Sequence, residues 1–201
     1  MSPNPSRKRA APRKRPYEQR LRAEQAAETR QRIVEAALHL HGTIGPARTT
    51  VSLVAAEAGV QRHTFYAHFP DEADLFLACS GLHQERDPMP DATDWRVVAD
   101  PKARLVKGLG ALYDWYGRNA TLIACVLRDA EHHALTRATV DLRIAPHLKT
   151  MADILGDGIP ARHRPLLRLA ISFHTWRSLV QESGLSPKAA INTLVHAIFG
   201  E

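Results

Sequence analysis

The fold of this chain is decided by residues 49–69, TTVSLVAAEAGVQRHTFYAHF. Thr50 is a candidate N-cap, because its hydroxyl can accept a hydrogen bond from an amide one turn into a helix. Gly59 stands where a tight turn needs a residue that tolerates a positive φ. Between these two positions, apolar residues recur at helical spacing and share one face: Val51, Val54, Ala55 and Ala58.

A second short helix is expected directly after this turn, over residues 61–68. Phe65 and Phe69 share one side of it and are expected to pack inward. The other side carries hydrogen-bond donors and acceptors and a planar cation: Gln61, Arg62, His63, Thr64 and Tyr66. Two helices joined by a tight turn, with polar side chains on the free face of the second, are typical of a helix-turn-helix that reads a DNA groove.

At these residues the chain resembles the tetracycline-repressor (TetR) family of bacterial transcription regulators. The resemblance covers residues 29–79, and a shorter run at 175–179, TWRSL, is similar to a late helix of many members. Two positions depart from the family pattern. Glu72 stands where members often carry a Lys near a DNA phosphate, and His63 stands where a small residue is common. The matching positions are Thr50, Ala55, Gly59, Val60, Thr64, Tyr66, His68, Phe69 and Leu75.

The resemblance implies an all-α fold of about nine helices. We expect a basic arm over residues 1–22, a three-helix DNA-binding domain over 23–70, and a helical effector-binding and dimerisation domain over 71–201. It also implies a cytoplasmic, ligand-responsive repressor that binds a palindromic operator on double-stranded DNA as a homodimer. Two alternatives remain open. One is a constitutive or architectural DNA binder without an effector, and the other is a helical enzyme or interaction module that keeps only the shape of the helix-turn-helix.

The net positive charge lies at the start of the chain. Residues 1–22 hold eight Lys or Arg and one acid, Glu18, whereas the remaining residues hold 19 basic and 20 acidic side chains. The segment 1–16, rich in proline and basic side chains, cannot build a core, so we expect it to be disordered in the free protein. It is expected to lie along DNA phosphates or in the minor groove, with a solubilising tail as the alternative.

The candidate DNA contacts divide into two kinds. Arg62 is suited to a guanine edge and Gln61 to an adenine, whereas threonine, tyrosine and histidine side chains nearby suit phosphates. For Tyr66 the alternative to a DNA contact is packing against the first helix. For Arg48 the alternative is a solvated surface charge without a DNA contact. The full candidate set is Arg13, Lys14, Arg15, Arg48, Thr50, Gln61, Arg62, His63, Thr64, Tyr66 and His68.

Helical periodicity continues through the second part of the chain. Expected helices include residues 17–40, 102–119, 134–155 (kinked by Pro146), 164–183 and 187–199. Aromatic side chains with a few polar groups indicate either a ligand pocket or an ordinary core: Trp115, Tyr116, Asn119, Arg128, Phe173, His174 and Trp176. The family pairs its last two helices across a dimer, which implies as interface residues Phe173, Leu179, Val180, Ile191, Leu194 and Ile198.

Other function classes find little support. The sequence has no G-x-S-x-G motif and no glycine-rich phosphate loop, and no His pair at i, i+4 has a carboxylate partner, so we expect no enzyme, metal or cofactor. Cys79 and Cys125 fit a reducing compartment. No apolar run approaches the ~18 residues of a membrane helix, and the charged start is unlike a secretory signal.

Overall fold

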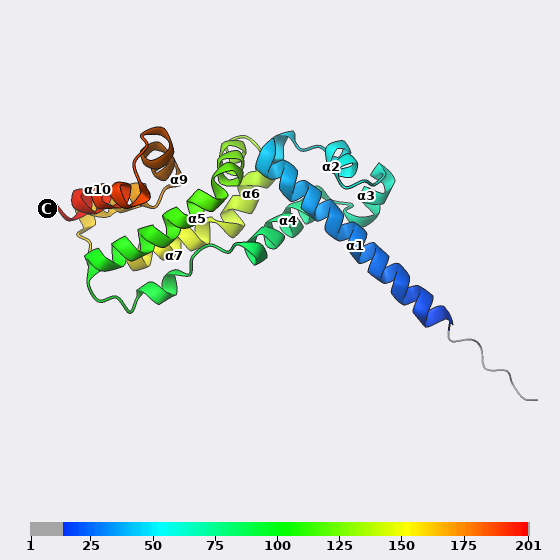
Figure 1. Cartoon of the computed structure of the whole chain (residues 1–201), viewed down its shortest axis with the longest axis horizontal. Coiled ribbons are helices and arrows are strands. Elements are labelled where there is room, and N and C mark those ends of the chain that lie inside the picture. Colours follow the sequence, from blue (N-terminus) through cyan, green and yellow to red (C-terminus); the bar gives the residue numbers. More distant parts are fainter. Residues whose placement is uncertain (1–13, 201) are drawn as a thin grey trace, which may run out of the picture.

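The computed structural model describes the backbone of residues 14–200 and the side chains of residues 17–200 (Figure 1). Within this part of the chain all regular structure is helical, which confirms the all-α prediction. The molecule is elongated, with the small helices α2 and α3 near one end and α10 near the other. The α-helices are α1 Lys14–Thr43, α2 Val51–Glu57, α3 Arg62–His68, α4 Glu72–Arg86, α5 Pro101–Ala130, α6 Ala134–Arg143, α7 Ala145–Leu155, α8 Arg164–Ala170, α9 Phe173–Trp176 and α10 Pro187–Phe199. Short 3₁₀ turns span Pro46–Arg48, Ala92–Trp95 and Ala161–His163, and a π-helical turn spans Arg177–Glu182.

The N-terminal helices form the expected helix-turn-helix. Thr50 caps α2, because its Oγ1 accepts a hydrogen bond from the Leu53 amide at 3.3 Å. Gly59 takes a φ of 65° and turns the chain toward α3. We call this unit, α1 to α4, the head. Its core consists of buried side chains from all four helices: Ile33, Val34, Ala36, Ala37, Val54, Ala55, Ala58, Phe65, Phe69, Leu75 and Cys79.

Helix α1 is longer than its periodicity predicts. It begins at Lys14 and ends at Thr43, so the expected domain boundary at residue 22 falls inside a helix. All side chains of residues 17–28 are exposed, so nothing in the described chain covers this projecting part of the helix. Arg13 lies outside the described residues, and the side chains of Lys14 and Arg15 are likewise not described.

The rest of the chain, called the body, is built around α5. This 30-residue helix buries residues along its whole length against its neighbours. Its own Leu105, Leu109 and Leu112 are each fully buried. Trp95, from the loop before α5, packs onto the same core with 3% exposure. Gly108 permits a close helix crossing, because a Cβ there would lie 2.6 Å from Leu155 on α7.

Two predicted helices are interrupted. Residues 134–155 divide into α6 and α7 at Ile144, where Pro146 has no amide hydrogen to continue the ladder. The single helix expected over 164–183 is wrong, since the chain breaks at Ile171 and Ser172 and restarts as α9.

The second break has a cause that lies elsewhere in the chain. Tyr113 donates its hydroxyl hydrogen to the Ala170 carbonyl at 3.0 Å, and Tyr116 donates to the Ile171 carbonyl at 2.7 Å. In a continuous α-helix those two carbonyls would accept from the amides four residues on. Ser172 instead adopts an extended conformation and caps α9 by accepting from the His174 amide.

Candidate DNA-reading surface and ligand cavity

The N-terminal part of α3 presents its polar side chains to solvent. Gln61, Arg62 and His63 are exposed, and Tyr66 is 45% exposed. Phe65 and Phe69 point the other way and are buried, with 0% and 1% exposure. The arrangement therefore leaves the groove-facing side chains of a helix-turn-helix free while its aromatic anchors hold α3 in place.

One further contact fixes α3 against the rest of the head. The guanidinium of Arg30 on α1 lies 4.5 Å from the centroid of the Phe69 ring, a cation–π distance. Tyr66 meets the edge of Phe65 at 5.5 Å between ring centroids and does not pack into the core. Thr64 and His68 are half-buried, and the Thr64 hydroxyl lies 3.3 Å from His63 Nε2.

The remaining candidate DNA contacts flank α3. Thr50 uses its oxygen as the cap of α2, which leaves its hydroxyl hydrogen available for a phosphate. Arg48 is exposed in the 3₁₀ turn before α2. Glu72 begins α4 next to Asp71, which accepts from the Ala73 amide at 2.9 Å. Acids in the first turn favour the positive end of a helix dipole, which gives Glu72 a structural reason for departing from the family pattern.

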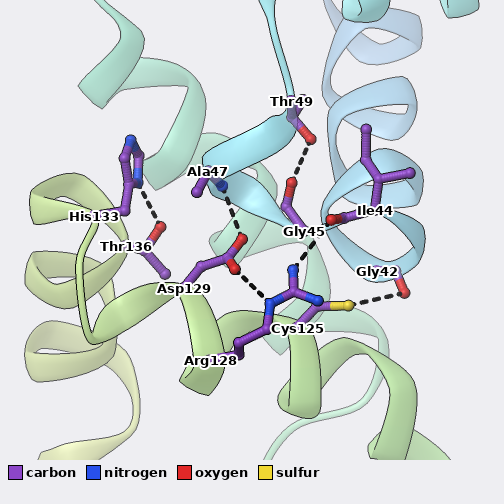
Figure 2. A network of polar contacts seen from close by, with 10 residues as sticks. All are labelled: Gly42, Ile44, Gly45, Ala47, Thr49, Cys125, Arg128, Asp129, His133 and Thr136. Carbon is purple, nitrogen blue, oxygen red and sulfur yellow. Dashed lines mark hydrogen bonds and ion pairs between the residues drawn. The ribbon is translucent and has the colours of Figure 1, made fainter.

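A polar network joins the head to the body where α5 ends (Figure 2). Asp129, with 2% exposure, accepts from the Ala47 amide through Oδ2 at 2.9 Å. Arg128 donates from Nη2 to the Ile44 carbonyl at 3.1 Å and from Nε to Asp129 Oδ1 at 2.7 Å. Gly45 packs against this pair, since a Cβ there would lie 2.2 Å from Arg128 Nη2 and 2.4 Å from Asp129 Oδ2.

The charge state of this network is set by hydrogen bonds. Burial alone would raise the pKa of Asp129, but hydrogen bonds from Arg128 and Ala47 outweigh it and leave the pKa below its usual value. Next to the network, burial and the neighbouring His133 lower the pKa of His41 to about 4. His41 lies 3.5 Å from Cys79 Sγ through Nδ1 and contacts the Phe76 ring. Near the junction of head and body, the carboxylate of Asp129 is therefore ionised, and the imidazole of His41, held between Cys79 and Phe76 of the head, is neutral.

This network includes Arg128, one of the predicted effector residues. The sequence pattern assigns Arg128 to a ligand pocket, but its side chain faces the loop between α1 and α2 and does not line the body's cavity. Asp129 and Gly45 are not predictable from the sequence pattern. Gly45-Pro46 indicates a turn, and Arg128-Asp129 is a pair of charged residues far from it along the chain. Nothing in the sequence indicates that the two pairs lie close together in space.

The body contains a large cavity of about 1020 Å³. Four of the predicted effector residues line it: Trp115, Tyr116, Phe173 and His174. Its other apolar walls come from α5, α7 and α8, and its charged residues include Lys149, Asp153, Asp157, Arg164 and Arg168. A mostly apolar cavity with a few polar groups, at the upper end of the ~300–1,000 Å³ typical of ligand sites, has room for a small molecule.

Besides Arg128, two further predicted effector residues lie outside this lining. Asn119 donates to Asp87 Oδ2 at 2.8 Å and to the Trp115 carbonyl at 3.0 Å, so its amide serves the fold. Trp176 is 2% exposed within the body core, against Phe173 and Tyr116. Both predictions rest on composition, which does not indicate the side of a helix on which a cavity opens.

The predicted dimer residues also divide by burial. Phe173, Ile191 and Ile198 are buried within the single chain, with 3%, 6% and 0% exposure, so the structure places these three side chains in the core of the body. The apolar helix faces on which these residues lie pack against other helices of the body. Leu179, Val180 and Leu194 are half-buried and stay candidates, together with the exposed Leu169, which the sequence pattern does not single out.

Two features that other functions would need are absent from residues 14–200. No helix in this range has the length and apolar content to cross a membrane. No group of three or more His, Cys, Asp or Glu side chains comes together there as a metal site would require.

The fold and the exposed face of α3 define the class as a helix-turn-helix protein with a helical body. Residues 33–79 match the family model of the bacterial regulatory proteins of the tetR family, so the resemblance seen in the sequence is confirmed. The HTH-type transcriptional regulator TtgR of Pseudomonas putida is 39% identical over 79 residues, 39% of this chain and 38% of TtgR. The sequence match thus spans well under half of that relative.

Solved structures show the same fold over most of the chain. A tetR-family transcriptional regulator from Streptomyces coelicolor aligns with a TM-score of 0.55 at 20% identity, covering 87% of this chain and 80% of that one. The multidrug binding protein EbrR, solved with imidazole, aligns with a TM-score of 0.55 at 23% identity, covering 84% and 94%. At these identities the likeness concerns the fold alone. The curated relatives that match are regulators, in keeping with the expectation of a non-enzyme.

Proposed function

We propose that this chain is a cytoplasmic, sequence-specific DNA-binding regulator of transcription that works as a homodimer. The observation that carries the proposal is the free face of α3, where Gln61, Arg62, His63 and Tyr66 are exposed above a buried Phe65. In a helix-turn-helix protein such a face enters the major groove, and a dimer reads two half-sites related by symmetry.

The head's other features support the same role. Thr50 and Arg48 stand at the start of α2, where phosphate contacts fix the position of the reading helix without reading sequence. Arg62 offers a fork of donors that suits a guanine edge, and Gln61 offers an amide that suits adenine. The basic residues that begin the chain are expected to add charge attraction to DNA phosphates.

A ligand in the body's cavity is proposed to change DNA affinity through α5. Trp115, Tyr116, Ile123 and Leu127 on this helix line the cavity, and the next residue after Leu127 is Arg128, which holds the Ile44 carbonyl. Movement of the end of α5 would therefore act directly on the loop that leads into α2. The ligand can shift DNA binding only by its different affinities for the two arrangements. Repression is the outcome we propose.

The experiment is a selection of bound duplexes from a random pool with the full chain. The proposal expects enrichment of an inverted repeat with half-site centres about one helical turn, ~34 Å, or a multiple apart. A double Gln61→Ala, Arg62→Ala variant is expected to lose that enrichment. Duplex binding without any preferred sequence would favour the architectural alternative, and the absence of duplex binding would contradict both.

The cavity favours the ligand-responsive form of the proposal over the constitutive one. A regulator without an effector would have a filled body, whereas this body holds about 1020 Å³ of open volume. The constitutive alternative would be favoured if no small molecule changed the affinity for the selected duplex.

A further inference from the structure

The cavity of the body is apolar in its depth and charged at its rim. Trp115, Tyr116 and Ile123 on α5 and Phe173 on α9, all buried, form its inner walls. Lys149, Asp153, Asp157, Arg164 and Arg168 line it too and are exposed. A molecule that fills it would thus bury an apolar part while a polar part remains near solvent.

The rim charges are not equally available to a ligand. Asp153 accepts from Lys149 Nζ at 3.2 Å, one helical turn away on α7. Asp157 pairs with Arg104, whose Nη2 lies 3.3 Å from Oδ2 and whose guanidinium is buried. Each carboxylate that lines the cavity therefore already has a basic partner.

The two arginines of α8 have none. Within residues 14–200, no hydrogen bond, ion pair or ring contact involves the side chain of Arg164 or that of Arg168. They stand at i and i+4 on one helix and both line the cavity, a spacing at which like charges repel each other. A bound anion would relieve this repulsion and accept from both.

We infer that the cavity takes an organic anion with a large apolar body and one negative group, which Arg164 and Arg168 hold at the rim. Guanidinium forks match carboxylate geometry and keep their charge at any pH at which proteins fold. Trp115, Tyr116 and Phe173 offer aromatic faces to the body of the molecule. The inference rests on the proposed ligand-binding role of the cavity, and it names the class of ligand.

The test compares three probes that share one body and differ in the head group: pyrenebutanoate, pyrenebutanol and pyrenebutylamine. Binding to the full chain is measured by calorimetry without DNA. The carboxylate is expected to bind roughly tenfold more tightly than the alcohol, the scale of one charged hydrogen bond, and the amine is expected to bind most weakly. Equal affinities for all three would overturn the inference.

Variants assign the preference to the two arginines. A double Arg164→Gln, Arg168→Gln variant is expected to bind the carboxylate no better than the alcohol. The matched control removes two exposed arginines outside the cavity lining, Arg137→Gln and Arg162→Gln, and should keep the preference. Ala152→Phe, within the lining, should weaken both probes.

The outcomes separate this inference from the proposed function. Binding of all three probes without preference would leave a ligand cavity but refute the anion. Binding of none would refute the ligand class, and the affinity of the same sample for its selected duplex would still report on the proposed DNA binding. A preference that survives the double Gln variant would place the anion elsewhere and refute the assignment.

Discussion

Asp129 and Ala47 lie 82 residues apart in the chain and are joined by a hydrogen bond of 2.9 Å, in which a carboxylate of the body accepts from an amide of the head. The carboxylate is 2% exposed and the amide belongs to the 3₁₀ turn that leads into α2. A buried charged acceptor depends on its donors, because the carboxylate itself has lost its contact with water. This bond therefore holds the head on the body together with the packing of α1 on α5 and of α4 on α6.

Asp129→Asn is expected to lower the free energy of unfolding by roughly 1–3 kcal/mol, the scale of hydrogen bonds to a charged group, because the buried acceptor loses its charge. The Asn retains one oxygen but loses the charge that holds Arg128. Urea unfolding of the two proteins measures the difference. Asp153→Asn is the matched control, since that carboxylate is 66% exposed in an i, i+4 pair and its removal should change stability by about 0.5 kcal/mol or less. Equal losses of unfolding free energy in the two variants would mean that the network around Asp129 stabilises the protein no more than an exposed ion pair.

Gly45→Ala should destabilise the protein more than Gly184→Ala. Both glycines have a positive φ, 97° and 70°, so both substitutions carry a backbone cost of order 1–3 kcal/mol, and this cost is larger at Gly45, whose ψ of 152° belongs to a region almost restricted to glycine. Only at position 45 does the new Cβ also collide with Arg128 and Asp129, whereas nothing lies within 4 Å of it at position 184. The difference between the two unfolding free energies combines the larger backbone cost at Gly45 with the packing at the junction, and equal values would contradict the prediction.

The stability of the protein is expected to fall between pH 6.5 and pH 4 because of His41. Its pKa is lowered from 6.5 to about 4 by burial and by His133, so in this range the unfolded chain binds more protons than the folded one. Stability therefore rises with pH across this window and the effect is absent above it. The full effect amounts to roughly 3 kcal/mol at ~1.4 kcal/mol per pKa unit.

The measurement is the urea unfolding free energy at a series of pH values for the parent and for His41→Gln. The variant should show a shallower slope between pH 4 and 6.5, whatever its stability at neutral pH. His83, whose pKa is also lowered by burial, and the acid Asp129 contribute to the slope that remains. His39→Gln, on the same helix but exposed, should leave the slope as it was; a change there equal to that of His41→Gln would refute the assignment.

Arg62→Ala is expected to weaken binding to the selected duplex by about 1–3 kcal/mol and to relax the preference at one base pair. The reason is the exposed position of its guanidinium at the start of α3. Binding assays on the cognate duplex and on duplexes changed at single positions measure both effects. Arg137→Ala, an exposed arginine on α6, controls for charge. A decrease of equal size on cognate and random duplexes would show that Arg62 contacts phosphate only.

Replacing the six basic residues of 1–16 by Ser should flatten the dependence of DNA affinity on salt. For every phosphate that the protein no longer neutralises, the slope of log affinity against log salt becomes shallower by about 0.9, because fewer counterions are released. The chain length is unchanged, so the comparison concerns charge alone. The slope is read from titrations of the selected duplex at several salt concentrations, and an identical slope would show that the arm does not touch DNA.

The head is predictable because its signals are local. Thr50, Gly59 and Phe65 act within one turn of their own positions, as a cap, a turn and an anchor, and each does in the structure what its neighbours in sequence indicate. The exposure of Arg62 follows in the same way, since Phe65 and Phe69 fix the buried side of a helix seven residues long.

The body is only partly predictable because its decisive interactions are long-range. Tyr113 and Tyr116 donate hydrogen bonds to the carbonyls of Ala170 and Ile171. The helix that periodicity predicts as continuous is therefore interrupted at Ser172, beside the cavity. Arg128 holds the loop before α2 and Ile198 packs inside the body for the same reason, since a sequence pattern does not say which neighbour a side chain meets. The sequence by itself thus determined the helices and the reading face, through caps, turns and spacing that act within a few residues. Only the tertiary structure decided where the cavity opens and how the head is held, because both depend on side chains meeting backbone groups more than fifty residues away.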